Sequence, residues 1–543
     1  MKKNILKYIL VCLCLAFCAC NDFLRVETDN VLDHNSYIDE ESEMYAGYIG
    51  VMTKVQAIGD KVIYLTDARG EMLAPTRNTP NDLYSLYNYE TDLAGNTYAD
   101  PAGYYDVIIA CNDYLLKLYD YKQKNPTTIN SSHYEALVSC ALRVKAWTYL
   151  TLGKIYGQAV WFDDPLREKK DLSQFPVKNL DDIVASCKNL LSKGFDGING
   201  KITMSWKEWL DPNTDLASSI YRYWDCMTPE YFPLYAELCL WSGDYQEAKN
   251  TILSAMNTKF GSTNSNSVDW LRNADNTEYA RFWNSASPYR PETVSAIIYD
   301  YKKNQTNSLL KHFDTNYPNG YLLAPSDSGM YRFSNPAFNN LGGASSDNRR
   351  NATFKQDSRG DYYICKYRPN SNVRANSYQD DVHIYIYRAG ELYFMLAEAL
   401  NNLGEYESAF ELINQGISYY FPSGGVTLDG FTDAWTTKTP TGTRTYADRG
   451  IRGVFGLGDR TFARTGTVTE EKKKANDLAI LDEMMLEFAC EGKIYPAMIR
   501  IAKRYNDYNI IADRVCPKYS NAGTIREKIL NGGYFVSWDL KNN

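Results

Sequence analysis

The chain has 543 residues, of which 44% are hydrophobic and 23% are charged, and its formal charge is −8. A chain of this length and composition can bury a sizeable core without disulfide bonds. Its acidic charge and the lack of a basic tract exclude nucleic acid and anionic lipid as partners that are bound by charge. Tyrosine is abundant, with 45 residues, and its ring combines an apolar face with a polar tip.

The first 19 residues have the layout of a secretory signal peptide. Three lysines and no acidic residue come first, and an apolar run of ten residues follows at 8–17, which is too short to span a bilayer. The run ends in Ala19-Cys20, which is similar to a bacterial lipobox with its small residue before the lipidated cysteine. We therefore expect residues 1–19 to be removed, Cys20 to be lipidated, and residues 20–43 to form the lipidated N-terminus and a tether. The alternative is ordinary cleavage that leaves Cys20 free.

The remaining chain is expected to form one mostly α-helical domain, residues 44–543. Apolar residues recur with helical spacing in several segments, of which 103–120 is the first. We predict a frame of helix pairs over about 103–258 and 386–505. Strand-like runs are short, at Val294–Tyr299 and Tyr362–Tyr367.

An internal repeat indicates what kind of helix pair forms the frame. Alanine, glycine, tyrosine and alanine follow one another at intervals of seven, two and three residues, and the pattern occurs twice. A small alanine allows close helix approach, glycine takes the turn, and tyrosine fills the groove after it, which is the tetratricopeptide pattern. A weaker third copy begins at Ala146 with Gly153. The two full copies are Ala236, Gly243, Tyr245, Ala248 and Ala397, Gly404, Tyr406, Ala409.

Long polar stretches separate and follow the repeats. They are rich in Asn, Ser, Thr, Gly and aromatic residues, and long irregular loops in a compact protein are usually functional or disordered. We predict that the loops form the ligand face, over about 60–100, 258–380 and 420–475.

Several short segments, spread over nearly the whole chain, form a recognisable series. They are Cys20-Asn-Asp-Phe-Leu, Tyr105–Asn112, Leu142–Leu150 with Tyr156-Gly157, Asp347-Asn-Arg-Arg350, Lys366-Tyr367, Arg388–Ala399 and Glu487–Lys493. In this order they resemble the SusD/RagB family, the surface lipoproteins of Bacteroidetes. The chain departs from the family in the long loops and at Ile494-Tyr-Pro496.

The resemblance implies a SusD-like α-helical fold built on tetratricopeptide-type helix pairs, with long loops and a few short strands. It also implies a lipoprotein on the cell surface of the outer membrane, where it covers a SusC-like TonB-dependent transporter. Members of the family bind glycans or, in some cases, peptides. The predicted partners are therefore that transporter, an oligosaccharide or a peptide, and the membrane through the lipid anchor.

No catalytic, cofactor or metal motif stands out. The sequence has no G-x-S-x-G, no P-loop and no H-E-x-x-H, and its four histidines are far apart. Residues 314–320 only partly imitate a calcium loop, because Pro318 occupies a ligand position, and a turn is expected there. We expect neither enzymatic activity, nor a cofactor, nor a metal.

Three glutamates at helical spacing, Glu483, Glu487 and Glu491, share one predicted face near Arg500 and Arg504. They have the arrangement of side chains that either contact a substrate or form ion pairs. Ordinary charge patterning on helices favours an ion-paired or solvated face.

Aromatic and planar polar side chains gather in two loop stretches. A flat ring can cover the C–H face of a pyranose, and amide or guanidinium groups can bind its hydroxyls, although loop aromatics also fill small local cores. Neighbouring polar residues, Asn81, Asn284, Arg290, Asn319 and Arg332, belong to the same stretches. The predicted ligand-binding residues are Arg77, Asn78, Tyr84 and Tyr87 in the first stretch, and Trp283, Tyr289, Tyr321 and Tyr331 in the second.

The leading hypothesis is a lipoprotein that captures oligosaccharides and delivers them to the transporter. In an alternative hypothesis the protein forms the same complex with the transporter but captures oligopeptides, as a RagB-like lipoprotein would. Two further alternatives are a secreted hydrolase on a helical-repeat scaffold and a structural surface protein.

Overall fold

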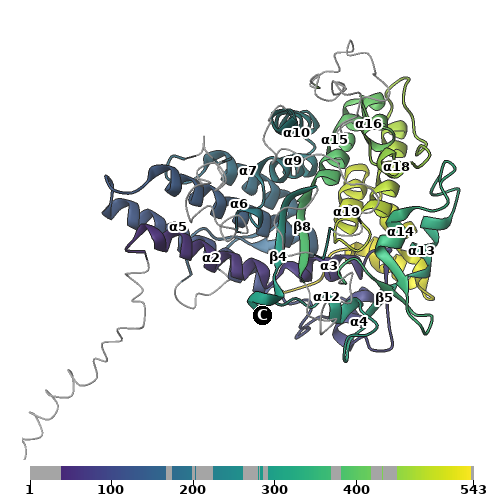
Figure 1. Cartoon of the computed structure of the whole chain (residues 1–543), viewed down its shortest axis with the longest axis horizontal. Helices are drawn as coiled ribbons and strands as arrows, with labels where there is room; N and C mark the ends of the chain where they lie inside the picture. The colour runs from purple at the N-terminus through teal and green to yellow at the C-terminus, as the bar shows by residue number, and fades with distance from the viewer. Residues whose placement is uncertain are drawn as a thin grey trace, which may run out of the picture.

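The computed structural model describes residues 38–166, 174–198, 202–203, 224–260, 279, 282–284, 292–368, 381–417, 431 and 449–539. The described chain is mostly helical, with short strands, so the predicted fold class is confirmed (Figure 1). The signal peptide, Cys20 and most of the tether lie outside the described residues. Among the residues that the structure describes, no helix is both long and apolar enough to cross a bilayer.

The helices fall into a long N-terminal group, a central group and a C-terminal group. In chain order they are α2 (Glu41–Gln56), α3 (Gly59–Asp67), α4 (Asn81–Tyr87), α5 (Ala102–Lys124), α6 (Ser131–Tyr156), α7 (Leu180–Lys193), α9 (Tyr231–Ser242), α10 (Tyr245–Phe260), α12 (Leu309–Phe313), α13 (Asp327–Ser334), α14 (Asn348–Thr353), α15 (Ala389–Leu403), α16 (Tyr406–Ile413), α18 (Glu470–Glu487), α19 (Ile494–Tyr505), α20 (Asn509–Val515) and α21 (Ala522–Lys528).

Neighbouring helices pack side by side into one layered frame. Helix α5 packs against α6, α6 against α7, α7 against α9, α9 against α10, and α10 against α15, which also contacts α16 and α18. Figure 1 shows this series running from α2 and α5 on the left to α16 and α18 at the upper right. The described helices thus form a continuous series of packed neighbours.

Polar caps and left-handed glycines set the ends of the long helices. The side chain of Asn130 accepts hydrogen bonds from two backbone amides in the first turn of α6, and that of Asn179 accepts one, from Asp182 N, in α7. Gly157 ends α6 with a φ of 72°, a conformation that costs glycine little. The Tyr156-Gly157 segment therefore marks a helix end.

The two copies of the repeat form the predicted helix–turn–helix units. Gly243 ends α9 with a φ of 78°, and Gly404 ends α15 with a φ of 83°. The four alanines of the repeats are all fully buried, because the helices approach closely where each side chain is small.

The prediction of a third, weaker copy of the repeat is wrong, because Gly153 lies inside α6 and not in a turn. A Cβ atom at Gly153 would lie 2.7 Å from Leu180 Cδ1 and 3.3 Å from Ile183 Cδ1. Glycine at this position allows α7 to approach α6, which is a packing role that the repeat pattern does not describe.

Within the described ranges, short strands form antiparallel pairs: β1 with β5, β2 with β3, β4 with β8, and β6 with β7. The stretches predicted as irregular loops thus contain short helices and strands, held by local caps such as Ser326, whose side chain accepts from Gly329 N in α13. The bounds are β1 (Leu73–Pro75), β2 (Gln158–Val160), β3 (Val177–Asn179), β4 (Thr293–Tyr299), β5 (Leu323–Pro325), β6 (Phe354–Gln356), β7 (Tyr362–Ile364) and β8 (Val382–Arg388).

A buried network of charges joins β8 to the C-terminal helices. Arg388 contacts Glu487 at 2.9 Å, Glu491 at 3.0 Å and Glu292 at 3.2 Å, and its side chain is fully buried. Arg349 reaches Glu487 at 3.2 Å from the other side. These glutamates therefore form ion pairs inside the core, which confirms the ion-paired alternative of the sequence analysis.

The same network continues along α18 to Glu483, which lies within 2.8 Å of Arg349, 2.6 Å of Arg452 and 2.7 Å of Arg460. Burial alone raises the pKa of Glu483, but the three guanidinium groups outweigh it and hold the pKa below its ordinary value. The carboxylate is thus ionised in the folded protein and depends on its cationic partners.

Candidate functional site

A cavity of about 570 Å³ lies where the first loop stretch meets the second. Strands β1 and β5 pair Leu73 with Pro325 and Pro75 with Leu323, so the chain that follows β1 runs beside the chain that precedes β5. In Figure 1 this region, with α4, α12 and β5, lies on the side opposite to α9, α10 and α16. We call it the loop pocket, and it is lined by Pro75, Thr76, Arg77, Asn78, Thr315, Tyr317, Asn319, Gly320, Tyr321, Ala324, Arg359 and Asp361.

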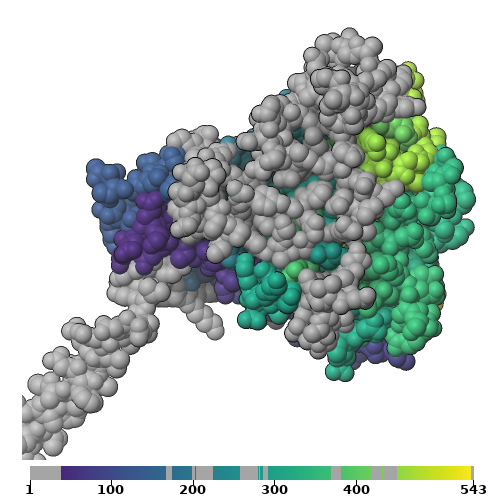
Figure 2. All heavy atoms as spheres, viewed as in Figure 1, coloured from purple at the N-terminus to yellow at the C-terminus, as the bar shows by residue number. Residues whose placement is uncertain are grey.

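Figure 2 shows that the segments around this region contribute to the outer surface. The green atoms of the segment that follows β5 cover the right of the view, and blue-purple atoms of the first loop stretch appear at its lower edge. The two stretches are thus neighbours, because β1 pairs with β5, although about 250 residues separate these strands in the chain.

Hydrogen bonds hold the two walls of the loop pocket together. Asn78 Nδ2 donates to the carbonyl oxygen of Gly320 at 2.9 Å, and Thr79 Oγ1 donates to that of Leu322 at 2.5 Å. The hydroxyl of Thr76 donates to the carbonyl oxygen of Tyr321. These bonds fix the position of the 319–321 segment relative to β1, so the pocket is formed without a ligand.

The 319–321 segment has a strained backbone. Asn319 has a φ of 54° and Tyr321 a φ of 62°, and an aromatic residue seldom adopts this left-handed conformation. Tyr321 N donates to the carbonyl oxygen of Lys311 at 2.8 Å, and the Tyr321 hydroxyl donates to that of Tyr362. Burial, followed by the nearby Asp361, raises the pKa of Tyr321 to about 12, so its hydroxyl is neutral at physiological pH.

Glycine is required at position 320. A Cβ atom there would lie 2.8 Å from the carbonyl oxygen of Lys311 and 2.9 Å from Tyr317 Cδ1. We expect Gly320→Ala to lower the free energy of unfolding by about 1–3 kcal/mol and to speed amide hydrogen exchange at Tyr321. The matched control is Gly523→Ala in α21, where a Cβ atom meets nothing within 4 Å. Equal behaviour of the two variants would contradict the assigned packing of Gly320.

Three of the eight predicted ligand-binding residues, Arg77, Asn78 and Tyr321, line the loop pocket. Asn319, a neighbour in the second predicted stretch, lines it too. Arg77 and Asn319 are exposed, and Tyr321 is half-buried. The structure thus brings residues from the two predicted stretches into one cavity.

Two further predicted residues, Tyr84 and Tyr331, present their rings to solvent elsewhere. Tyr84 in α4 is 48% exposed, and Tyr331 in α13 is 63% exposed. Neither belongs to the lining of the loop pocket. Tyr84 follows β1 and Tyr331 follows β5, and because these strands are antiparallel the two residues leave the strand pair at opposite ends.

The predictions for Tyr87 and Trp283 are wrong, because both rings are buried. Tyr87 packs against Tyr519, with ring centroids 4.5 Å apart. Trp283 is fully buried, with Lys366 Nζ 4.3 Å from its ring centroid. Both side chains stabilise the core and offer no face to a ligand. The eighth predicted residue, Tyr289, lies outside the described residues.

Among the lining side chains that the sequence did not single out are an aromatic ring and two charged groups, Tyr317, Arg359 and Asp361. Tyr317 belongs to the 314–320 segment, whose sequence predicts a turn and gives no sign of a ligand-binding role. Arg359 and Asp361 come from the turn between β6 and β7, and Arg359 is paired with Asp357 at 2.7 Å. No spacing signal connects that turn to residue 77, so only the fold could reveal the contact.

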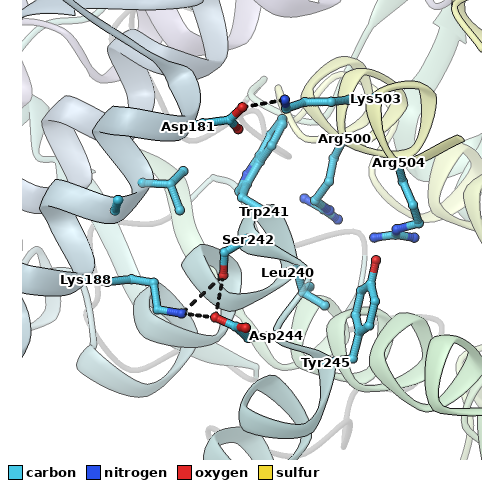
Figure 3. Close-up of a pocket in the computed structure, with 13 residues that line it drawn as sticks. Asp181, Lys188, Leu240, Trp241, Ser242, Asp244, Tyr245, Arg500, Lys503 and Arg504 are labelled. Carbon is cyan, nitrogen blue, oxygen red and sulfur yellow. Dashed lines mark hydrogen bonds and ion pairs between the residues drawn. The ribbon is translucent and has the colours of Figure 1, made fainter. Parts of the chain in front are cut away.

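A second cavity, of about 760 Å³, lies between the helices of the frame, and we call it the helix groove (Figure 3). Helix α7, the α9–α10 turn and α19 supply its walls. Figure 3 shows Trp241 and Tyr245 beside Arg500 and Arg504. The groove is lined by Asp181, Val184, Ala185, Lys188, Leu240, Trp241, Ser242, Gly243, Asp244, Tyr245, Arg500, Lys503 and Arg504.

The charged side chains of the helix groove are already paired with one another or with the core. Lys503 contacts Asp181 at 2.7 Å, and Arg500 binds Glu398 at 2.7 Å. Lys188 pairs with Asp244, and Arg504 pairs with Glu398 and Asp477. A charged ligand would have to displace these partners, so the loop pocket is the better candidate site.

No metal centre is found in the part of the chain that the structure describes, since no three histidine, cysteine, aspartate or glutamate side chains are grouped to hold an ion. The 314–320 segment forms turns, as expected. The described lining of the loop pocket includes a single carboxylate, Asp361.

Comparison with solved structures shows the fold. A SusD superfamily protein from Bacteroides vulgatus is 13% identical, with a TM-score of 0.62 over 92% of this chain and 96% of that one. NanU from Bacteroides fragilis is 16% identical, with a TM-score of 0.54 over 90% and 94%. Surface glycan-binding protein A from Bacteroides uniformis is 16% identical, with a TM-score of 0.57 over 92% and 94%.

Among curated protein sequences, none matches this chain. The sequence model of the SusD family matches residues 241–531, which is more than half of the chain. This span contains the end of the first copy of the helix repeat, the whole second copy, the second loop stretch and the C-terminal helices with their buried charges. The chain therefore belongs to the SusD family, as the resemblance predicted.

Proposed function

We propose that this protein is a cell-surface lipoprotein of the outer membrane that captures oligosaccharides and delivers them to a SusC-like TonB-dependent transporter. The observation that carries the proposal is the loop pocket, where two tyrosine rings, Tyr317 and Tyr321, meet two amide side chains, Asn78 and Asn319. Its volume of about 570 Å³ is within the range of small-molecule sites.

The chemistry of the lining suits a sugar. A tyrosine ring is a flat apolar face that can cover the C–H side of a pyranose, and its hydroxyl adds a polar edge. Amide side chains both donate and accept, which matches the alternating needs of sugar hydroxyls. Because hydrogen bonds from Thr76 and Asn78, just after β1, hold the 319–321 segment, little conformational entropy is lost when a ligand binds.

We propose that the protein binds its glycan and does not catalyse a reaction on it. Glycoside hydrolysis ordinarily needs a pair of carboxyl groups across the scissile bond, and the described lining supplies Asp361 alone. The solved structure from Bacteroides uniformis is named a surface glycan-binding protein, which supports binding as the activity of this fold.

We base the proposed transporter partner on family membership, and the proposed membrane anchor on family membership and on the lipobox-like sequence that ends at Cys20. The experiment for the partner is affinity purification of the chain from detergent-solubilised outer membranes of its own host. Recovery of a TonB-dependent barrel in stoichiometric amount is expected. Recovery of the chain without a barrel would contradict delivery of oligosaccharides to a transporter, but it would not contradict their capture by this chain.

Loss of the Tyr321 ring is expected to weaken glycan binding. We expect Tyr321→Ala to raise the Kd of the bound oligosaccharide by roughly 5- to 30-fold, about 1–2 kcal/mol, since a stacking ring in a pocket is a typical energetic anchor. Tyr321→Phe keeps the ring and is expected to retain most of the affinity. Isothermal titration of the detergent-solubilised protein with hits from a glycan array measures both.

Tyr331→Ala is the matched control, because it removes an exposed tyrosine outside the lining. It should leave the Kd unchanged. If Tyr331→Ala and Tyr321→Ala lowered the affinity for the oligosaccharide equally, the loop pocket would not be the binding site. If the array gave no hit and a peptide library did, the oligopeptide alternative would replace the glycan.

A further inference from the structure

Arg77 differs from the other charged side chains of the loop pocket. It is exposed at the pocket lining, and within the described residues no carboxylate lies at ion-pair distance from its guanidinium group. Its neighbour Asn78 is tied to Gly320, which fixes the backbone of this wall. Arg77 thus brings to the pocket lining a positive charge that has no ion-pair partner among the described residues.

Arg359, the second arginine of the lining, is neutralised. It contacts Asp357 at 2.7 Å and Asp361 at 3.7 Å, and it donates to the carbonyl oxygen of Thr315 at 3.3 Å. A ligand anion that approached Arg359 would compete with two carboxylates. The positive charge available to a ligand in this pocket is therefore that of Arg77.

We infer that the loop pocket selects glycans that carry a carboxylate, as uronic and other acidic sugars do, and that Arg77 is the residue that recognises the carboxylate. The inference rests on the proposed function and names the substrate class of that same site. The planar guanidinium fork matches a carboxylate in two parallel hydrogen bonds, which a neutral hydroxymethyl group cannot accept in the same way.

The surroundings of Arg77 support this assignment. Tyr317 and Tyr321 supply ring faces for the sugar ring, and Asn319 supplies an exposed amide for its hydroxyls. No ion pair among the described residues has to break before Arg77 binds, in contrast to Arg500 and Arg504 of the helix groove, which already bind Glu398. The cost of capturing an anion is accordingly lower in the loop pocket.

The test uses pairs of sugars that differ only in charge. Oligogalacturonides, alginate oligosaccharides, hyaluronan oligosaccharides and sialyllactose are each compared with the same compound after its carboxyl groups are reduced to hydroxymethyl groups. We expect the full lipidated chain in detergent to bind at least one acidic member about tenfold or more tightly than its reduced partner. The preference should shrink between 50 mM and 500 mM NaCl, because salt screens an exposed charge.

The variants identify the residue. Arg77→Gln is expected to abolish the preference by weakening the acidic sugar about tenfold or more while leaving its reduced partner unchanged, and Arg77→Lys should restore part of it. Arg526→Gln is the matched control, since it removes one positive charge from α21, which supplies no residue to the pocket lining. It should behave as the unmodified protein.

The outcomes separate this inference from the proposed function. Equal affinity for acidic and reduced sugars, with a dependence on Tyr321, would overturn the inference and leave glycan capture standing. A sulfated neutral oligosaccharide that binds as tightly as the carboxylated one would also overturn carboxylate selection. Binding of an acidic peptide, with no sugar of the panel bound, would overturn both.

Discussion

Replacing Arg388 with alanine is expected to lower the free energy of unfolding by about 3–5 kcal/mol, because the change leaves buried carboxylates without their shared cation. Arg388 lies within 3.2 Å of Glu292, Glu487 and Glu491, and none of these side chains is more than 3% exposed. Burial raises the cost of each negative charge, and Arg388 offsets this cost at three of them. Urea unfolding followed by circular dichroism measures the change, with the m-value checked for constancy.

Two further variants show whether charge or geometry matters. Arg388→Lys keeps the positive charge but loses the guanidinium fork that serves several carboxylates at once, so an intermediate loss is expected. Arg526→Ala breaks an ion pair with Asp513 that is 39% and 63% exposed, and it should cost less than about 1 kcal/mol. A loss for Arg388→Ala as small as that of Arg526→Ala would contradict the role assigned to the network.

This network also shows what four of the family-like segments, those that contain Asp347, Lys366, Arg388 and Glu487, have in common. Asp347 binds Arg349 at 2.7 Å, Lys366 binds Glu491 at 2.7 Å, and Arg388 joins Glu487 to Glu491. The segments look unrelated along the chain, but their charged residues meet in one buried cluster. Sequence reasoning identified the residue types, and the fold was needed to show which of them pair.

The helix frame could be predicted because its signals are local. An alanine, a glycine and a tyrosine at fixed intervals describe one turn between two helices, and each residue acts on neighbours a few positions away. Gly153 shows the limit of this argument. Its type and spacing suit a turn, but its neighbours in space, Leu180 and Ile183, come from another helix that the pattern does not include.

The loop pocket could be predicted only in part. Its residue types pointed to both stretches, but the pairing of Leu73–Pro75 with Leu323–Pro325 involves strands of three residues, which are too short for a periodicity signal. Composition likewise cannot tell which loop aromatic is buried. Trp283 and Tyr321 both belong to the second loop stretch, yet the first is buried in the core and the second lines the pocket.

Replacing Cys20 with alanine is expected to release the protein from the membrane fraction almost completely, the largest change that any single substitution here should produce in location. Ala19 directly before Cys20 is the small residue that a lipobox requires, and an acylated N-terminus carries more than one chain, which is what stable anchoring needs. Metabolic labelling with a clickable fatty acid should tag the unmodified protein and leave Cys20→Ala untagged, with the variant recovered in the soluble fraction.

Cys18→Ala is the matched control for this experiment, because Cys18 follows the bulky Phe17 and does not meet the same requirement. It should keep both the label and the membrane location. If Cys20→Ala kept the fatty acid, or if both variants partitioned as the unmodified protein does, the lipid anchor would be wrong. The folded domain could still bind its glycan in that case, but a freely diffusing receptor would lose captured sugar to the medium, and delivery to a membrane-bound transporter would require another means of attachment.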